Sequence, residues 1–398
     1  MKQNNTNEHT HKFGILPLII LVVAGFTFNT SELIPIGLLT DIATDFGVSE
    51  AKAGLLITVY AWVVAVMSLP LMLAFAKMNF RTLMMGVVAT FLVSHVFTVL
   101  STGYYGLMAS RIGVALAHSI FWSIAPAMAV AVMPAEKRAS ALSALVAGGG
   151  IAMIMGLPLG RVLGLVAGWR MTFAAIGVLA ALILLGLWKR FPSISPDLTA
   201  GESRKQMLKQ LWTCKPLVCI YVITAVIVTG HYTGYSYIEP FMAQIVGMSD
   251  DAITLTLSLF GVAGLLGSWI MSKYYMKYSK RLILWSCFGL PVVMLLLLPA
   301  SGVSTLLLAS LCILWGMAMT VYNIAFQNEI VALFPGDSAV PMSFYSGIFN
   351  LGIGGGAMVG GWVVDYGWIA NIGYVGGGIA LCAAIFCLFA YIPLRPKS

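Results

Sequence analysis

The sequence predicts an all-α membrane protein with twelve transmembrane helices in two six-helix bundles and with both termini in the cytoplasm. The observations behind this fold class are the composition, the length of the apolar stretches and the positions of the basic residues. Among the 398 residues, 60% are hydrophobic and 9% are charged, and the mean hydropathy is +0.95. Soluble globular chains are about 45–50% apolar and about 25% charged. The expected solvent of this chain is therefore a bilayer.

Each predicted span is an apolar stretch of about 20 residues or more, which as a helix crosses roughly 30 Å of hydrocarbon. Short polar links separate the spans. In chain order they cover residues 14–39, 50–75, 82–101, 104–132, 139–164, 169–189, 216–246, 252–272, 281–300, 304–334, 340–365 and 368–393. The predicted units are a cytoplasmic tail (1–13), a first bundle (14–189), a cytoplasmic linker with a short amphipathic helix (190–215) and a second bundle (216–393).

The basic residues predict the orientation of the spans. Lys and Arg accumulate in short cytoplasmic loops, and with the N-terminus inside, 18 of the 22 basic residues are cytoplasmic. The exceptions are Lys52, Arg111, Arg161 and Arg170. The net charge of +8 is then explained by topology, so we expect no nucleic-acid partner. The polar N-terminal segment and the long apolar run behind it do not fit a cleavable signal peptide.

The two halves of the chain resemble each other. GWRMTFAAIGVLAAL (168–182) opens span six, and GWIANIGYVGGGIAL (367–381) opens span twelve. Gly168, Trp169 and Gly177 recur 199 residues later, as Gly367, Trp368 and Gly376. An even number of crossings separates the copies, so they have the same orientation. Two parallel six-helix repeats, with a substrate path between them near the membrane midplane, are typical of secondary transporters.

Other protein classes fit the sequence less well. The six cysteines are mostly within spans and show no C-x2-C spacing, so we interpret them as apolar fillers and expect no metal or other cofactor. The spans contain no H-E-x-x-H, no G-x-S-x-G and no paired aspartates, which argues against an enzyme. The glycine-rich runs follow no predicted strand and lack the Lys-Ser/Thr of a phosphate-binding loop. A channel would not explain the parallel repeat with a polar site at mid-depth.

Several segments carry a family resemblance. RIGVALAHSIFWSIAPA in span four, GLPLGRVLG in span five and GWRMTF entering span six resemble motifs of the major facilitator superfamily, specifically its drug-proton antiporter branch. YAWVVAVMSLPLML, TGHYTGYSYIEPF and FYSGIFNLGIGGGAMVG are similar to bacterial sugar efflux transporters of the SotB type. One departure is AFAKMNFRT between spans two and three, which keeps two basic residues but lacks the acid usual in that loop.

The resemblance implies a proton-coupled antiporter that exports sugars and sugar-like small molecules from the cytoplasm by alternating access. The alternative is a multidrug-proton antiporter for amphipathic drugs. We expect a monomeric, multi-pass protein of the bacterial inner membrane whose partners are the substrate, protons and the lipid bilayer.

The stretch FTFNTSELIPIG (26–37) places the carboxylate of Glu32 inside span one. A charge near the centre of a bilayer costs roughly 2.5–3.5 kcal/mol on insertion scales. Glu32 and Arg111 both lie about seven residues from the outer ends of their spans, or roughly 10 Å deep. In the fold that the resemblance implies, these two spans are neighbours. The pair is then either a proton site, in which the cation tunes the carboxyl group, or a static ion pair that joins two helices.

Two histidines are candidates for substrate binding. His118 lies seven residues inward from Arg111 on the same face of span four, and His231 lies near the middle of span seven. Facing one cavity from opposite bundles, the two rings would suit sugar hydroxyls, because a neutral imidazole offers one donor and one acceptor. The alternative for each is a buried histidine that is hydrogen-bonded within its own bundle.

Span seven carries a further polar stripe. His231, Tyr235 and Glu239 follow one another at four-residue spacing and therefore share a helix face. Glycines and Pro240 weaken the helix here, so we predict a bend. Glu239 is a second candidate proton carrier, and a gating role at the outer end is the alternative.

Span eleven and its neighbours add uncharged polar groups. Ser343, Ser346 and Asn350 form a narrow seam on span eleven, and Asn29 and Tyr60 lie in spans one and two. Amides, hydroxyls and aromatic rings at mid-depth suit neutral polyhydroxylated molecules about as well as amphipathic drugs. The alternative is hydrogen bonding between helices, which contributes around 0.6 kcal/mol in membranes.

The glycines of span five predict close packing. Gly156, Gly160 and Gly164 recur at four-residue spacing with Pro158 between them, and glycine at this spacing lets helix backbones approach closely. They resemble the family's antiporter motif, which implies a structural role in preventing leakage.

Overall fold

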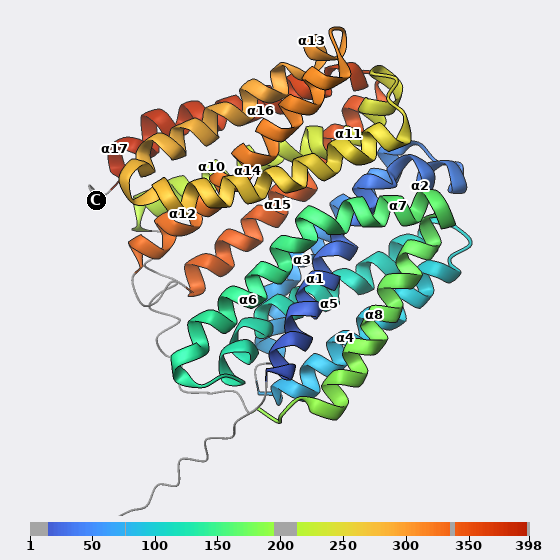
Figure 1. Cartoon of the computed structure of the whole chain (residues 1–398), viewed down its shortest axis with the longest axis vertical. Coiled ribbons are helices and arrows are strands. Elements are labelled where there is room, and N and C mark those ends of the chain that lie inside the picture. Colours follow the sequence, from blue (N-terminus) through green and yellow to red (C-terminus); the bar gives the residue numbers. More distant parts are fainter. Residues whose placement is uncertain (1–14, 76, 195–212, 335–338, 396–398) are drawn as a thin grey trace, which may run out of the picture.

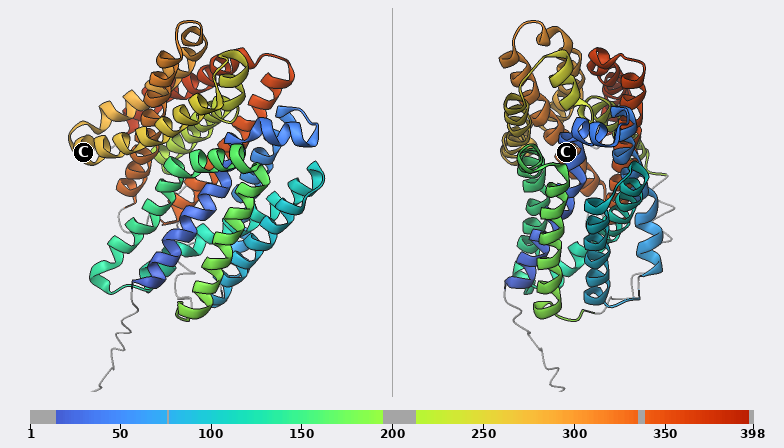
Figure 2. Two further views of the ribbon diagram at one scale, coloured as in Figure 1. Left: turned by 45° about the vertical axis from the view of Figure 1, so that its right-hand side comes forward. Right: turned by 90° about the vertical axis from the view of Figure 1, so that its right-hand side faces the viewer.

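The computed structural model describes residues 15–75, 77–194, 213–334 and 339–395 as helices and short connections. The predicted tail and most of the predicted linker, with its amphipathic helix, lie outside these residues. Figure 1 shows one bundle formed by α1–α8 and a second formed by α10–α17, and Figure 2 shows the same grouping from two other sides.

The first bundle contains α1 (Leu16–Gly37), α2 (Leu39–Phe46), α3 (Glu50–Ala74), α4 (Phe80–Leu100), α5 (Tyr104–Ala131), α6 (Arg138–Ile151), a π-helix (Ala152–Gly156), α7 (Leu157–Ala167) and α8 (Trp169–Arg190). The second contains α10 (Lys215–Tyr235), α11 (Ile238–Pro240), a π-helix (Phe241–Ile245), α12 (Asp250–Leu295), α13 (Leu297–Ser301), α14 (Thr305–Leu333), α15 (Ala339–Asp365), α16 (Ile372–Phe386), a π-helix (Cys387–Tyr391) and α17 (Ile392–Leu394). Short 3₁₀ turns cover Ala135–Lys137 and Ile369–Asn371.

The helical content follows from the solvent, because a spanning segment must satisfy its backbone N–H and C=O groups internally. Within the described residues, eleven helices are long and apolar enough to cross a membrane. One of them, α12, has 46 residues and a non-helical backbone at Tyr278. At 1.5 Å per residue, such a helix exceeds twice the hydrocarbon thickness. It contains predicted span eight and most of predicted span nine, whose last residues lie in α13.

Left-handed glycines mark the internal repeat. Among the described residues, the positive-φ positions are Gly47, Gly168, Gly247 and Gly367. Gly168 and Gly367 (φ +87° and +72°) end α7 and α15 at the positions that the sequence comparison aligned. Gly47 and Gly247 follow α2 and the π-helix after α11, at nearly the same spacing. A side chain would be strained at these turns, so each half uses glycine at the same two corners.

The predicted bend in span seven is present. The helix α10 ends at Tyr235, α11 begins at Ile238, and a π-helix follows Pro240. A proline removes a backbone donor and crowds the preceding turn, which explains why regular α-helix does not continue here. The break re-aims the chain before it reaches the second bundle's α12.

The bundles meet along two seams. In the first seam α3 packs along α15, and Trp62 Nε1 donates to the Leu351 carbonyl over 3.3 Å. In the second, α7 and the π-helix before it pack on α12. A Cβ atom at Gly261 would lie 2.7 Å from Ile154 Cα. This glycine therefore lets the two backbones touch.

The second bundle is closed by a cluster around Glu329 at the end of α14. Arg395 donates to both carboxylate oxygens of Glu329 over 2.7 Å, and to Ser279 Oγ over 2.8 Å. Tyr275 and Tyr391 also donate to Glu329. Because the residues come from α12, α14, the π-helix Cys387–Tyr391 and the chain beyond α17, the cluster ties the C-terminal segment to the bundle.

We expect Arg395→Gln to lower the midpoint of thermal unfolding in detergent, because Glu329 then remains buried without a cation. Removing one partner of a buried ion pair costs about 3–5 kcal/mol. The double variant Glu329→Gln, Arg395→Gln should recover much of the loss. Arg190→Gln, at the exposed end of α8, is the control. A melting midpoint of Arg395→Gln equal to that of the wild type would contradict the prediction.

Candidate functional site

A polar cluster lies where α1, α3 and α5 of the first bundle face one another. His118 Nε2 lies 3.8 Å from Glu32 Oε2, and the Tyr60 hydroxyl lies 2.7 Å from His118 Nδ1. When Tyr60 donates to Nδ1, the neutral imidazole carries its proton on Nε2, which faces Glu32. The structure thus brings together three of the predicted site residues, and a proton shared by Glu32 and His118 would have a short path.

Arg111 lies beside this cluster without joining it. The Nη1 atom of Arg111 donates to Ser31 Oγ over 3.2 Å, and its guanidinium lies 4.6 Å from the centroid of the Tyr60 ring. Such stacking is a cation–π contact. No ion pair joins Arg111 to Glu32 among the described residues; the two interact through the electrostatic field alone. Glu32 and Arg111 are thus neighbours, as predicted from the sequence, but no hydrogen bond joins them directly.

The surroundings of Arg111 leave part of it unsatisfied. The side chain is 1% exposed, and its Nε and Nη2 atoms have no hydrogen-bond partner among the described residues. Ser31 in turn pairs with His95 Nε2 over 2.9 Å, while His95 Nδ1 lies 2.8 Å from the Phe91 carbonyl. His95 was not predicted as a site residue. Its signal in the sequence is a histidine in an otherwise apolar span.

We expect Tyr60→Phe to lower the free energy of unfolding in detergent by about 1–3 kcal/mol, the cost of leaving a buried partner unsatisfied. The variant removes the hydroxyl at His118 and keeps the ring under Arg111. Tyr60→Leu should cost more because the cation–π contact is also lost. Tyr374→Phe, a tyrosine that is 41% exposed, is the control. An unchanged stability of Tyr60→Phe would show that the hydroxyl does not hold His118.

A small cavity of about 10 Å³ lies between the bundles at Glu32. It is lined by Glu32, Leu33, Ile36, Ile57, Tyr60, Ala61, Tyr232 and Ile353, from α1, α3, α10 and α15. A cavity needs about this volume to hold a single water molecule, so the bundles are in close contact here. The side chain of Glu32 is 21% exposed, whereas Arg111 behind it is buried.

His231 does not reach this cavity. Its Nδ1 atom accepts from Trp315 Nε1 over 2.9 Å, and its ring stacks on Tyr235 with 5.1 Å between centroids. Phe260 also stacks on Tyr235, with 4.7 Å between centroids, and its ring lies 6.4 Å from that of His231. The residue from α10 that lines the cavity is Tyr232, which the sequence analysis did not single out.

The amide residues differ in how well they are satisfied. Asn29 accepts from Trp122 Nε1 over 3.0 Å and donates to the Gly149 carbonyl over 3.4 Å, so both its groups are used within the first bundle. Asn350 donates to the carbonyl of Ser346 over 3.0 Å. Its Oδ1 atom is buried and has no partner among the described residues.

A second charged cluster joins the bundles at the end of the molecule that carries α2 and α11 (Figure 1). Arg161 Nη1 lies 3.3 Å from Glu239 Oε1, and Arg161 Nη2 donates to Asp250 Oδ1 over 2.8 Å. Arg161 comes from the first bundle and both acids come from the second. We call Arg161, Glu239 and Asp250 the interbundle latch. In the sequence, Arg161 is distinguished only as one of the four basic residues outside the predicted cytoplasmic set.

Further hydrogen bonds cross at the same end. Thr40 Oγ1 lies 2.8 Å from Glu239 Oε2 and 3.0 Å from Glu50 Oε1, and Gln244 Nε2 donates to Glu50 Oε1 over 2.6 Å. The single hydroxyl proton of Thr40 is donated to one carboxylate at a time, while Gln244 also donates to Glu50 and Arg161 pairs with Glu239. These bonds and the latch hold the two bundles together at the α2 end.

The span-five residues pack α7 and its π-helix against α1. A Cβ atom at Gly156 would lie 2.4 Å from Thr30 Oγ1, and one at Gly160 would lie 2.8 Å from Ile34 Cγ1. Gly164 meets Leu38 in the same way. Pro158 stands in the first turn of α7, directly after the π-helix, where the missing N–H is least costly.

In the part of the chain that the structure describes, two helical bundles meet around polar and charged side chains, an architecture that secondary transporters have. The chain belongs to the major facilitator superfamily, because the model of that family matches residues 18–340 and, again, 222–398. The overlap of the two matches agrees with an internal repeat.

Solved structures of transporters share the fold. A D-xylose-proton symporter is 15% identical, with a TM-score of 0.79 over 97% of this chain and 100% of its own. A bacterial homolog of the human lysosomal transporter Spinster, in an inward-facing and occupied conformation, is 16% identical, with a TM-score of 0.76 over 96% and 98%. A mutant form of the nucleoside transporter NupG is 14% identical, with a TM-score of 0.73 over 96% and 100%. Likeness at this identity shows the fold alone.

Proposed function

We propose that this protein is a proton-coupled antiporter that exports sugars and sugar-like small molecules by alternating access. In this proposal the chain crosses a bacterial inner membrane twelve times as a monomer, with α12 crossing twice and both termini in the cytoplasm. The two bundles, 14–189 and 216–393, rock about the substrate site. The α2 end then faces away from the cytoplasm.

The observation that carries the proposal is the position of Glu32. It is a carboxyl group that borders the cavity between the bundles, with His118 3.8 Å away and the uncompensated Arg111 behind it. A deprotonated Glu32 is stabilised by the positive charge of Arg111 and can accept hydrogen bonds from a substrate in the cavity that it lines. A proton bound to the same carboxylate takes up one of these acceptor sites. In this proposal the proton and the substrate therefore compete for Glu32, as antiport requires.

The substrate groups in this proposal are neutral hydrogen-bonding side chains. Asn350 offers a buried acceptor without a partner among the described residues, and Ser346 on the same helix is exposed. Tyr60 and Tyr232 bring rings and hydroxyls to the cavity from opposite bundles. Polyhydroxylated molecules need such donors and acceptors. The D-xylose-proton symporter of similar fold supports the view that this architecture can combine a sugar with protons.

An amphipathic drug is the second candidate substrate. The walls of the cavity at Glu32 are otherwise apolar, with Leu33, Ile36, Ile57 and Ile353 among them. An apolar wall with one carboxyl group suits an organic cation as well as a sugar.

The decisive experiment reconstitutes the purified protein in liposomes with an imposed pH gradient and compares radiolabelled sugars with lipophilic cations. We expect sugar to move in the direction opposite to the proton flow. This movement should stop when a protonophore dissipates the pH gradient. Movement of cations without sugars would establish the drug alternative. Transport of neither, with intact folded protein, would overturn the proposal.

A further inference from the structure

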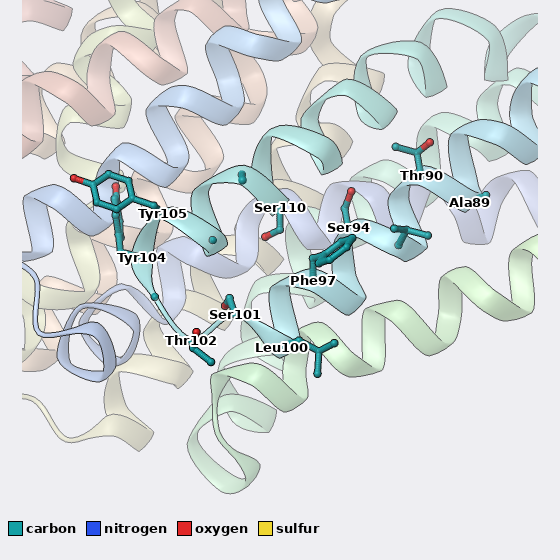
Figure 3. Close-up of a pocket in the computed structure, with 14 residues that line it drawn as sticks. Ala89, Thr90, Ser94, Phe97, Leu100, Ser101, Thr102, Tyr104, Tyr105 and Ser110 are labelled. Atoms are coloured by element: carbon teal, nitrogen blue, oxygen red, sulfur yellow. The ribbon is translucent and has the colours of Figure 1, made fainter.

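A groove of about 920 Å³ lies on the outside of the first bundle between α4 and α5, away from the bundle interface (Figure 3). Helix α4 packs against α5 and α8, so its outer face is turned to the surroundings. The walls of the groove are exposed apolar side chains: Val93 is 52%, Phe97 62% and Leu100 67% exposed. On a membrane-spanning helix, exposed apolar side chains such as these face the hydrocarbon of the bilayer.

The mouth of the groove is aromatic and positively charged. Tyr104 and Tyr105 line it, and the Lys52 Nζ atom lies 5.2 Å and 5.3 Å from the centroids of their rings. Lys52 forms no ion pair among the described residues. The helix α5 also begins here without a side-chain cap, so its first N–H groups add to the positive potential.

A second cation touches the same mouth. Arg170 donates to the carbonyl of Ser101, which lines the groove, over 3.0 Å. Its charge is offset by Asp45, with which it forms an ion pair. Lys52 is therefore the cation whose charge remains for a ligand. Four basic residues lie outside the predicted cytoplasmic set. Two of them, Lys52 and Arg170, thus contact residues at the same end of this groove.

We propose that this groove binds a phospholipid with an anionic headgroup. One acyl chain lies along Val93 and Phe97, and the headgroup lies at Lys52 with the two tyrosines beside it. Tyrosine is enriched at the level of the headgroups of both leaflets, and the ammonium group of Lys52 attracts a negatively charged headgroup. The site is separate from Glu32 and the latch, so it is independent of the transported substrate.

Native mass spectrometry of the purified full-length protein tests this site. The probes are phosphatidylglycerol and phosphatidylcholine with identical acyl chains, so that only the headgroup charge differs. We expect the wild type to retain phosphatidylglycerol in preference. Lys52→Gln should reduce that preference about fivefold, the effect of one basic residue near an anionic lipid surface. Lys273→Gln is the control, because Lys273 also stacks on two aromatic rings but lies far along the chain on α12.

A second pair of variants tests the groove itself. Gly106 lines the groove and has open space around it, with Ser101 Cβ the nearest atom at 3.8 Å from an added Cβ. Gly106→Leu should fill the groove and remove both lipids. Gly86→Leu, an exposed and equally open glycine on α4 outside the groove, should remove neither. If Gly106→Leu lowers the melting midpoint, Ala109→Leu, at another exposed groove position, replaces it.

Two results would overturn the proposal. Equal retention of the two lipids by the wild type would show that the headgroup charge is not recognised. Unchanged lipid retention in the groove-filling variant, with Lys52→Gln also equal to Lys273→Gln, would place lipid elsewhere on the bundle.

Discussion

Glu32→Gln should abolish substrate movement driven by a pH gradient and should leave downhill substrate exchange measurable. Glutamine keeps the size and the polarity of the side chain, but it cannot take up or release a proton at pH values near neutrality. The cavity between Tyr60 and Tyr232 stays lined as before. The measurement is accumulation of labelled substrate in proteoliposomes with and without a gradient, followed by exchange at equal pH.

Glu32→Asp is the matched control for this variant, because it retains a carboxyl group at the same place on α1. It should keep gradient-driven movement at a reduced rate. Full gradient-driven activity in Glu32→Gln would exclude Glu32 as the proton carrier. The remaining candidate would then be Glu239, whose carboxylate is engaged by Arg161 and Thr40 in this conformation.

Arg161→Gln should open the α2 end of the molecule. The variant removes both ion pairs of the latch and leaves Glu239, which is 4% exposed, without a cation. A broken buried pair costs about 3–5 kcal/mol, and each 1.4 kcal/mol changes an equilibrium about tenfold. The ratio of molecules that are closed at this end to molecules that are open there should therefore fall roughly a hundredfold or more. Substrate transport should slow because one state of the cycle is depleted.

Distances between spin labels across the α2 end measure this shift. Labels at Thr44 on α2 and Asp251 on α12, both exposed, report the separation of the two bundles in a cysteine-free background. The control is Arg170→Gln, which breaks an exposed ion pair within the first bundle. Its distance distribution should match that of the parent. A distribution for Arg161→Gln that also matches the parent would show that the latch does not hold the bundles together.

The helices and the repeat were predictable from the sequence because each is visible in short segments of the chain. A membrane-spanning helix needs an uninterrupted apolar stretch, and every such stretch predicted in the described part of the chain is helical. The repeat is visible in Gly168 and Gly367, which recur because each half needs a left-handed residue at the same corner. A further signal was missed: Ser49 and Ser249 cap α3 and α12 two residues after a glycine in both halves.

The partners of the polar residues were harder to predict, because neighbouring positions of a helix point about 100° apart. His231 was expected at the cavity, but its neighbour Tyr232 lines it, and His231 pairs with Trp315 inside the second bundle. Glu32 and Arg111 lie at equal distances from the outer ends of their spans, and this predicted that the two side chains are at the same level of the membrane. The equal distances could not show that Ser31 and the Tyr60 ring hold the guanidinium in this conformation.

The sequence by itself determined the solvent of this protein, the positions of its helices, the parallel repeat and the short set of polar residues that the membrane leaves unexplained. The hydrophobicity and the helical conformation of a segment depend mainly on the residues of that segment, so both can be predicted from the sequence. The tertiary structure alone decided which of those residues meet. Arg161 is separated along the chain from Glu239 and Asp250 and belongs to the other bundle, so only the rotation and docking of complete helices bring the three charges together.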